Sequence, residues 1–141
     1  MCSYCGCKDI ELIGRYMEEH DQLINELGIL RRACDEQDLA AVRGACEHLA
    51  GLMRPHFDSE ERSLFAVLRE DEDFTEHVDD LCAEHEDLWA LFDAVKGGDF
   101  GGYKAFEDRL RVHMDREDNG LFPAAAVSLD GPSWDRIMEL A

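Results

Sequence analysis

The sequence predicts an all-α protein folded as an up-down-up-down four-helix bundle, with a short N-terminal Cys-rich tail and a short C-terminal helix. Three observations support this fold class. Apolar residues recur at intervals of three and four along four long segments, as they do on one face of an amphipathic helix. Turn signals separate these segments closely, and short connections favour antiparallel neighbours. The two-residue alternation typical of strands is almost absent.

The first two helices follow from apolar stripes with polar residues before them. The first is expected to begin after Asp9, a suitable N-cap, and to continue to about residue 33. The second is expected from about Asp38 to residue 68. Pro55 is expected to bend it, because proline lacks an amide hydrogen and its ring crowds the carbonyl four residues earlier.

The third and fourth helices are bounded by glycine pairs. The third is expected from about residue 73 to Gly97-Gly98, and the fourth follows Gly101-Gly102. Gly120 and Pro123 should end or loosen the fourth helix.

A short last helix, from about residue 133 to residue 140, is expected after Asp130-Gly131-Pro132. The predicted organisation is therefore a Cys-rich tail (1–8), a bundle (9–126) and a C-terminal loop with a short helix (127–141).

Composition limits the classes of function. A chain of 141 residues with 45% hydrophobic and 33% charged residues fits one globular domain. The net charge of −19 should repel phosphate backbones and anionic membranes, so nucleic acid is not an expected partner. No apolar run approaches the roughly 18 residues of a membrane span, and the first ten residues lack a signal-peptide core. We therefore expect a cytoplasmic protein with no membrane partner.

Six cysteines fall into two groups. Cys2, Cys5 and Cys7 crowd the start of the chain, where they could bind a metal, act as redox thiols, or form an exposed tail with incidental thiols. Cys34, Cys46 and Cys82 lie within helical patterns and are expected as small buried residues.

A repeated motif carries the main functional signal. The stretch HFDSEERSLF (56–65) recurs as HMDREDNGLF (113–122), and in each copy a histidine is followed four residues later by a glutamate. A spacing of four places His56 and Glu60 on one helix face, and likewise His113 and Glu117.

The first and third helices add one histidine each, His20 in EEHDQL and His85 in AEHEDL. Burying an ionised glutamate without a partner costs several kcal/mol, and two on inward faces would compound that cost. Two divalent cations would remove it, with carboxylates bridging the metals and imidazoles filling further positions. Carboxylate and imidazole ligands favour iron or manganese, whereas zinc is usually satisfied by four ligands. The predicted metal ligands are His20, His56, Glu60, His85, His113 and Glu117.

Other polar and aromatic residues receive a structural interpretation. His48 and His77 each lie eight residues before an expected ligand, about 80° round the helix, and are expected as hydrogen-bonded core histidines. Tyr16 lies one turn before His20, so it could ligate a metal or donate a hydrogen bond to bound oxygen species, or it could be a core aromatic. Trp89 and Phe92 are expected to wall the site.

The blocks EEHDQL, HFDSEERSLF, AEHEDLWAL and HMDREDNGLFPA resemble the hemerythrin-like, or HHE cation-binding, domain over residues 9–126. The resemblance implies a four-helix bundle with a non-haem centre of two irons, bridged by carboxylates and an oxo or hydroxo group. Oxygen-carrying hemerythrins have a further histidine one turn from the third-helix ligand. Here the residues one turn from His85 are Leu81 and Trp89. The resemblance therefore implies ligand roles for only four histidines and two glutamates.

Three functions remain open. The loss of one histidine leaves roughly two of about twelve octahedral positions for water or substrate, which favours decomposition of hydrogen peroxide by a catalase-like or peroxidase-like reaction, with no catalytic group beyond the metal ligands. The same residues could instead bind or sense dioxygen or nitric oxide without turnover. A third hypothesis is an iron-binding or redox sensor that uses Cys2, Cys5 and Cys7.

Overall fold

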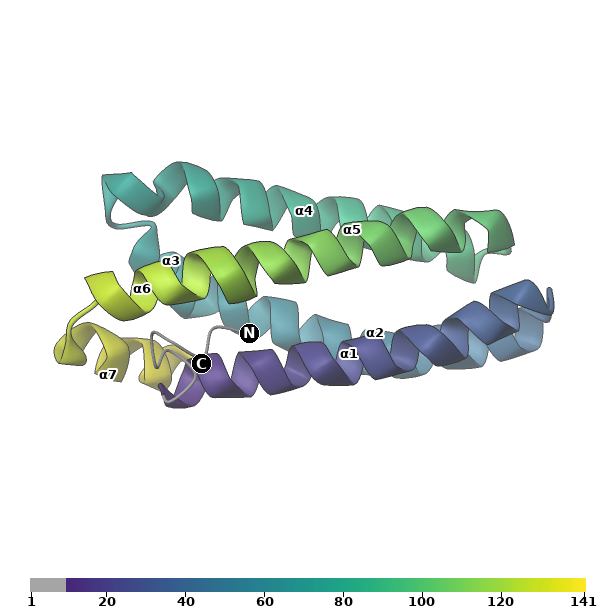
Figure 1. Cartoon of the computed structure of the whole chain (residues 1–141), viewed down its shortest axis with the longest axis horizontal. Coiled ribbons are helices and arrows are strands. Elements are labelled where there is room, and N and C mark those ends of the chain that lie inside the picture. The colour runs from purple at the N-terminus through teal and green to yellow at the C-terminus, as the bar shows by residue number, and fades with distance from the viewer. Residues whose placement is uncertain (1–9) are drawn as a thin grey trace.

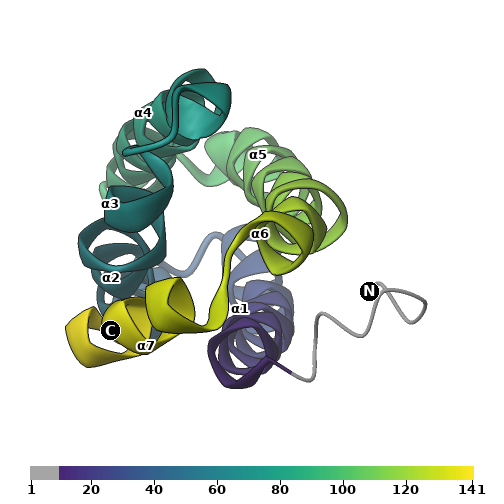
Figure 2. The ribbon, with the colours of Figure 1, turned by 90° about the vertical axis from the view of Figure 1, so that its left-hand side faces the viewer.

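The computed structural model describes residues 10–141, and four long helices lie side by side along its length (Figure 1). These helices are α1 (Glu11–Asp35), α2 (Leu39–Arg62), α4 (Glu72–Lys96) and α5 (Tyr103–Arg116). Viewed from one end they occupy the corners of a square in chain order, so each packs against its predecessor and its successor (Figure 2). Residues 10–141 contain no strand, which confirms the all-α prediction for this part of the chain. The predicted Cys-rich tail, residues 1–8, lies outside the described residues.

Side-chain caps begin two of these helices. Asp38 accepts a hydrogen bond from the backbone N–H of Ala41 (3.1 Å) at the start of α2, which begins where the sequence predicted it. Asp71 does the same for α4 by accepting from the N–H of Asp73 (2.9 Å). The prediction for α1 was wrong, because the N-cap position is Ile10, which offers no side-chain cap. Asp9 itself lies outside the described residues.

The interruption of the second helix lies inside the first motif and not before it. The helix α2 continues through Pro55, and Ser63 separates it from the short helix α3 (Leu64–Leu68). Pro55 is tolerated because the residue four positions earlier is Gly51, and both are exposed, so the displaced carbonyl can bond to water. The break at Ser63 was not predicted, and the bend expected at Pro55 stays a prediction.

The second motif departs from a regular helix at the corresponding position. After α5 the chain forms one π-helical turn, η3 (Glu117–Leu121), and continues as α6 (Phe122–Ser128). Gly120 lies inside the π turn, and Pro123 occupies the first turn of α6, where its missing N–H costs nothing. The predicted loosening is confirmed, although the helix resumes beyond it. The first motif therefore leaves regular α-geometry at Ser63, three residues after Glu60, and the second leaves it at Glu117 itself. Turns of the π type are frequent at functional sites.

Short connections and a final helix complete the bundle. A 3₁₀ turn, η2 (Phe100–Gly102), joins α4 to α5, and Gly98 before it has φ +115°, a conformation that favours glycine. The helix α7 (Gly131–Leu140) begins with Asp130, whose carboxylate accepts from the N–H of Ser133 (2.8 Å). Ile137 of α7 is fully buried, so this helix docks at one end of the bundle beside α3 (Figures 1 and 2).

The buried apolar residues form two separate clusters. One contains Leu23, Leu49, Met53, Phe57 and Phe92 among others, and the second contains Leu12, Tyr16, Phe65, Leu81 and Phe122 among others. Among residues 10–141 no helix combines the length and the apolar character that crossing a bilayer requires. The polar residues described next lie between the two clusters along the helices.

Candidate metal centre

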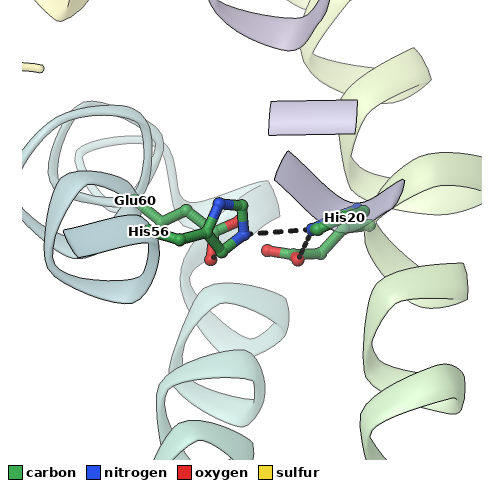
Figure 3. A group of neighbouring side chains, drawn as sticks. His20, His56 and Glu60 are labelled. Atoms are coloured by element: carbon green, nitrogen blue, oxygen red, sulfur yellow. Dashed lines mark hydrogen bonds and ion pairs between the residues drawn. The ribbon is translucent and has the colours of Figure 1, made fainter. Parts of the chain in front are cut away.

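The structure brings the six predicted ligand residues together in the interior of the bundle. Glu60 and Glu117 are fully buried, and the four histidines have exposures of only 1–2%. His20 comes from α1, His56 and Glu60 from α2, His85 from α4, His113 from α5 and Glu117 from the π turn. Figure 3 shows His56 and Glu60 projecting from α2 toward His20 of α1. Every long helix therefore contributes to one polar layer in an otherwise apolar core.

The six side chains form two overlapping groups of four. One group contains His20, His56, Glu60 and Glu117, and the other contains Glu60, His85, His113 and Glu117. Within each group the possible ligand atoms all lie within 4.8 Å of one another. Both glutamates belong to both groups, so each group has two imidazoles of its own and shares two carboxylates.

Individual distances show the same arrangement. The Nε2 atoms of His20 and His56 are 3.1 Å apart, and those of His85 and His113 are 3.2 Å apart. Glu60 lies between the pairs, with its Oε1 atom 3.5 Å from His56 Nε2 and 3.3 Å from His85 Nε2.

Glu117 occupies the corresponding place on the opposite side of the layer. Its Oε1 atom is 3.2 Å from Nε2 of His20 and 3.4 Å from Nε2 of His113. All four Nε2 atoms therefore point inward, and each carboxylate reaches one histidine from each pair.

The carboxylate oxygens indicate that the site suits cations. All four oxygens of Glu60 and Glu117 are buried and make no satisfactory hydrogen bond within the described part of the chain. Buried polar atoms are normally satisfied, and unpaired buried carboxylates are especially costly. Two divalent cations placed between imidazole nitrogens and shared carboxylates would satisfy these oxygens. The His/Glu cluster could therefore hold metal ions, and its donor set fits iron.

Without a cation the two glutamates cannot both ionise easily. Burial and the negative charge of Glu117 hold the pKa of Glu60 well above its usual range. Burial alone would lower the pKa of His20, but the hydrogen bond with Asp118 and the nearby negative charge of Glu117 outweigh burial and raise that pKa to about 9. Burial lowers the pKa of His56. Protons thus take up part of the positive charge that metal ions would supply.

Each histidine is oriented by a carboxylate from a neighbouring helix. The Nδ1 atom of His20 lies 2.8 Å from Asp118, that of His56 2.7 Å from Glu19, that of His85 2.9 Å from Glu61, and that of His113 2.8 Å from Glu84. A carboxylate at Nδ1 holds the proton there, so Nε2 presents its lone pair to the centre of the site. This orientation is typical of histidines that ligate a metal.

The four orienting carboxylates were missed by the sequence reasoning, although a signal for them existed. Glu19 and Glu84 directly precede two of the clustered histidines, while Glu61 and Asp118 directly follow the two clustered glutamates. Adjacent residues point about 100° apart on a helix, so these four side chains reach the histidine of the adjoining helix instead of the centre of the site.

Tyr16 is buried one turn before His20, but its hydroxyl is engaged elsewhere. The oxygen lies 2.8 Å from Ser59 Oγ and 3.0 Å from Ser63 Oγ, both on the second-helix segment. Burial raises the pKa of Tyr16 to about 12, so the phenol stays protonated at neutral pH. Its ring packs edge-on against His56 at 5.3 Å. Donation to a bound oxygen species would require the hydroxyl to give up a serine, and the core-aromatic interpretation accounts for its contacts.

His48 and His77 lie outside the cluster, but the prediction that they are core residues was wrong. The side chain of His48 is 58% exposed, and its Nδ1 atom lies 3.7 Å from a carboxylate oxygen of Glu26. His77 is half-buried beside an open pocket at the surface. A rotation of about 80° from the ligand face turns both toward the surface instead of into the core.

The aromatic wall also differs from the expected one. Phe57, and not Trp89, stacks on His85, with ring centroids 3.9 Å apart and planes at 12°. Phe65 and Phe122, which close the two motifs, stack on His85 and His20 at 5.8 and 5.9 Å.

Of the cysteines in the described residues, Cys34 and Cys46 are buried, as predicted, and Cys82 is half-buried. Cys2, Cys5 and Cys7 lie outside the described residues, so their proposed roles remain predictions.

Comparison with known proteins agrees with the geometry. No curated protein and no solved structure gives a significant match to this chain. The model of the hemerythrin HHE cation-binding domain matches residues 11–125, a span that contains all four long helices and all six clustered side chains. Proteins of this type bind metal ions, typically iron. The chain therefore belongs to the hemerythrin HHE cation-binding domain family.

Proposed function

We propose that this protein holds two iron ions between its four histidines and two glutamates and decomposes hydrogen peroxide. The observation that supports this proposal best is the equality of the two ligand groups. Each has two imidazoles and the same two shared carboxylates. Manganese suits the same donors and could replace iron.

Ligand counting makes peroxide the favoured substrate. Two octahedral metals offer about twelve positions, of which bridging glutamates fill about four and histidines about four more. A bridging hydroxide would take about two, which leaves roughly two positions divided equally between the metals. A single open position on one metal suits reversible binding of dioxygen. An open position on each metal instead suits the two-oxygen unit of peroxide, which gains or loses two electrons in the reaction.

Bound iron would supply the redox chemistry, in which one hydrogen peroxide molecule gains two electrons and another loses two. Together, two hydrogen peroxide molecules give two waters and one dioxygen. The chain's own residues provide the surroundings. Glu60 and Glu117 would offset part of the metal charge, while Glu19, Glu61, Glu84 and Asp118 hold the imidazoles through Nδ1. The rings of Phe57 and Phe65 stack on His85 and that of Phe122 stacks on His20, which helps to exclude bulk water from these histidines.

Two measurements on one preparation test the proposal. Elemental analysis of protein produced with iron and purified without chelator should find about two irons per chain, and an oxygen electrode should record dioxygen release on addition of hydrogen peroxide. Iron without dioxygen release, together with a reversible spectral change under dioxygen or nitric oxide, would favour the binding module. Zinc or no metal would refute the di-iron assignment.

A substitution at Leu81 tests the counting argument separately. Leu81 is fully buried one turn before His85. Leu81→His would add a nitrogen ligand on one side of the site and fill one open position. We expect slower dioxygen release from peroxide at unchanged iron content. Unchanged release with a coordinated fifth histidine would contradict the argument from open positions.

A further inference from the structure

Phe57 lies at the centre of the aromatic packing around the metal-binding cluster. Its ring centroid is 3.9 Å from that of His85, 5.7 Å from that of His113 and 5.9 Å from that of His56. The ring is nearly parallel to the His85 imidazole, at 12°. Phe57 is therefore in contact with histidines of both ligand groups, and its closest contact is a face-to-face stack on His85.

Trp89 continues this stack toward the surface. Its ring centroid lies 6.0 Å from that of Phe57, with the planes at 80°. Trp89 is half-buried, and the exposed Arg54 places its guanidinium 4.4 Å above the indole ring. Adjacent aromatic rings therefore lead from His85 through Phe57 to an indole at the edge of the protein.

The other half of the bundle has no such path. The internal repeat places Ile24 where the second half has Trp89, Met114 where the first motif has Phe57, and Arg111 where it has Arg54. Ile24, Met114 and Arg111 also lie together, because they line one surface pocket of about 200 Å³. The same positions can thus be packed with aliphatic side chains, and helix packing by itself does not demand the aromatic pair.

We infer that Phe57 and Trp89 carry single electrons between the metal site and a small reductant at the surface. This inference rests on the proposed function and adds a peroxidase route to it. The indole of tryptophan is oxidised far more readily than the phenyl ring of phenylalanine, so the electron tunnels across Phe57 and the oxidising equivalent rests on Trp89. The guanidinium of Arg54 disfavours a second positive charge on the ring. The oxidised indole therefore releases its Nε1 proton to solvent.

The electron balance closes with a one-electron donor such as ascorbate. Hydrogen peroxide takes up two electrons and two protons and gives two waters. Two ascorbate anions each supply one electron and one proton and become monodehydroascorbate radicals. In each of the two steps Trp89 loses one electron to the metal site and a proton to solvent, and then regains both.

The first experiment uses the iron-loaded full chain with hydrogen peroxide and no donor. Electrons are then drawn from the protein, and the overall change is one indole plus one peroxide giving hydroxyindole plus water. Peptide mass spectrometry should locate the added oxygen at Trp89 and not at Trp134, the other tryptophan, which packs with the second apolar cluster. Equal oxidation of both tryptophans, or the same pattern in iron-free protein, would overturn the inference.

The second experiment compares variants matched to the other half of the bundle. Trp89→Ile and Phe57→Met introduce the residues found at the corresponding positions, and Trp89→Phe keeps an aromatic ring that cannot be oxidised. Trp134→Phe is the control. We expect the three route variants to retain iron but to lose most of the ascorbate consumption that peroxide drives, while Trp134→Phe consumes ascorbate as the wild type does.

The outcomes separate this inference from the proposed function. Wild-type protein without iron, or without any reaction with peroxide, would refute the proposed function. Iron-loaded Trp89→Phe with the wild-type rate of ascorbate consumption would refute the electron route alone. Loss of iron from Trp89→Phe would also refute it, by showing that Trp89 supports the site only through packing.

Discussion

Glu60→Gln is the most informative substitution in the cluster, because it should change stability in opposite directions with and without metal. Glutamine has nearly the shape of glutamate but lacks its charge. Glu60 belongs to both ligand groups, so this one change weakens both cation positions. The metal-dependent part of stability should therefore nearly vanish in the variant.

The magnitude follows from mass action. Binding to the folded state alone stabilises it by about 2.7 kcal/mol when free metal is 100 times the Kd. For a chain of this size that corresponds to a rise in Tm of roughly 8–13 °C. We expect this rise in the wild type on loading with Fe(II) under anaerobic conditions, and only a small fraction of it in Glu60→Gln.

The metal-free proteins should show the reverse order. The pKa of Glu60 is raised in the folded state by burial and by Glu117. A carboxyl with a raised pKa opposes folding increasingly as the pH rises above its unfolded pKa, because the unfolded chain releases the proton more easily. At pH 7 glutamine removes this penalty, so the metal-free variant should unfold at the same temperature as the metal-free wild type or at a higher one.

Differential scanning calorimetry with and without Fe(II) measures both effects. Asp58→Asn is the matched control, since Asp58 is an exposed acidic residue of the same helix. It loses the same charge and should keep the full metal-dependent rise in Tm. A Glu60→Gln variant that is strongly destabilised without metal and still stabilised by Fe(II) would refute the assignment of Glu60 as a bridging ligand.

Three further substitutions test neighbouring parts of the argument. Glu19→Ala removes the partner of His56 Nδ1, so iron affinity measured by titration should fall about 10–100-fold; unchanged affinity would mean that the orienting bond is dispensable. His48→Ala should keep its iron in elemental analysis, because His48 is 58% exposed and outside both groups. Loss of iron would show that the metal-binding face of this helix has been assigned to the wrong residues. Gly98→Ala should lower the free energy of unfolding by on the order of 1–3 kcal/mol in chemical denaturation, because Gly98 has φ +115°, with iron content unchanged; no loss of stability would contradict the backbone argument.

The sequence alone was sufficient for the bundle and for the grouping of the six polar residues. Helical periodicity depends on near neighbours in the chain, so the stripes, the start of the second helix near Asp38 and the stop at Gly97 could be predicted directly. The His-x-x-x-Glu spacing works in the same way, since four residues make about one turn. Identification of the ligands beyond this grouping remains a proposal.

Helix ends and interruptions were less predictable. The helix α2 continues through Pro55, where the sequence suggested a bend, and its break at Ser63 was not predicted. Exposure depends on which side of the helix faces a neighbour, and periodicity alone assigns that side only approximately. The same limit explains the error at His48 and His77. The sequence pattern predicted that both lie in the core, whereas helix packing leaves them toward the surface.

What the sequence by itself determined is thus what lies within one helix: the elements, their inward faces and the residues that share a turn. Only the tertiary structure decided which helix supplies the partner of each group. It paired Glu19, Glu61, Glu84 and Asp118 with histidines on adjoining helices, bound the Tyr16 hydroxyl to two serines, and placed Phe57 between His85 and Trp89. The physical reason is that such contacts depend on the rotation and axial offset of one helix against another, which the packing of the whole core sets and no single segment encodes.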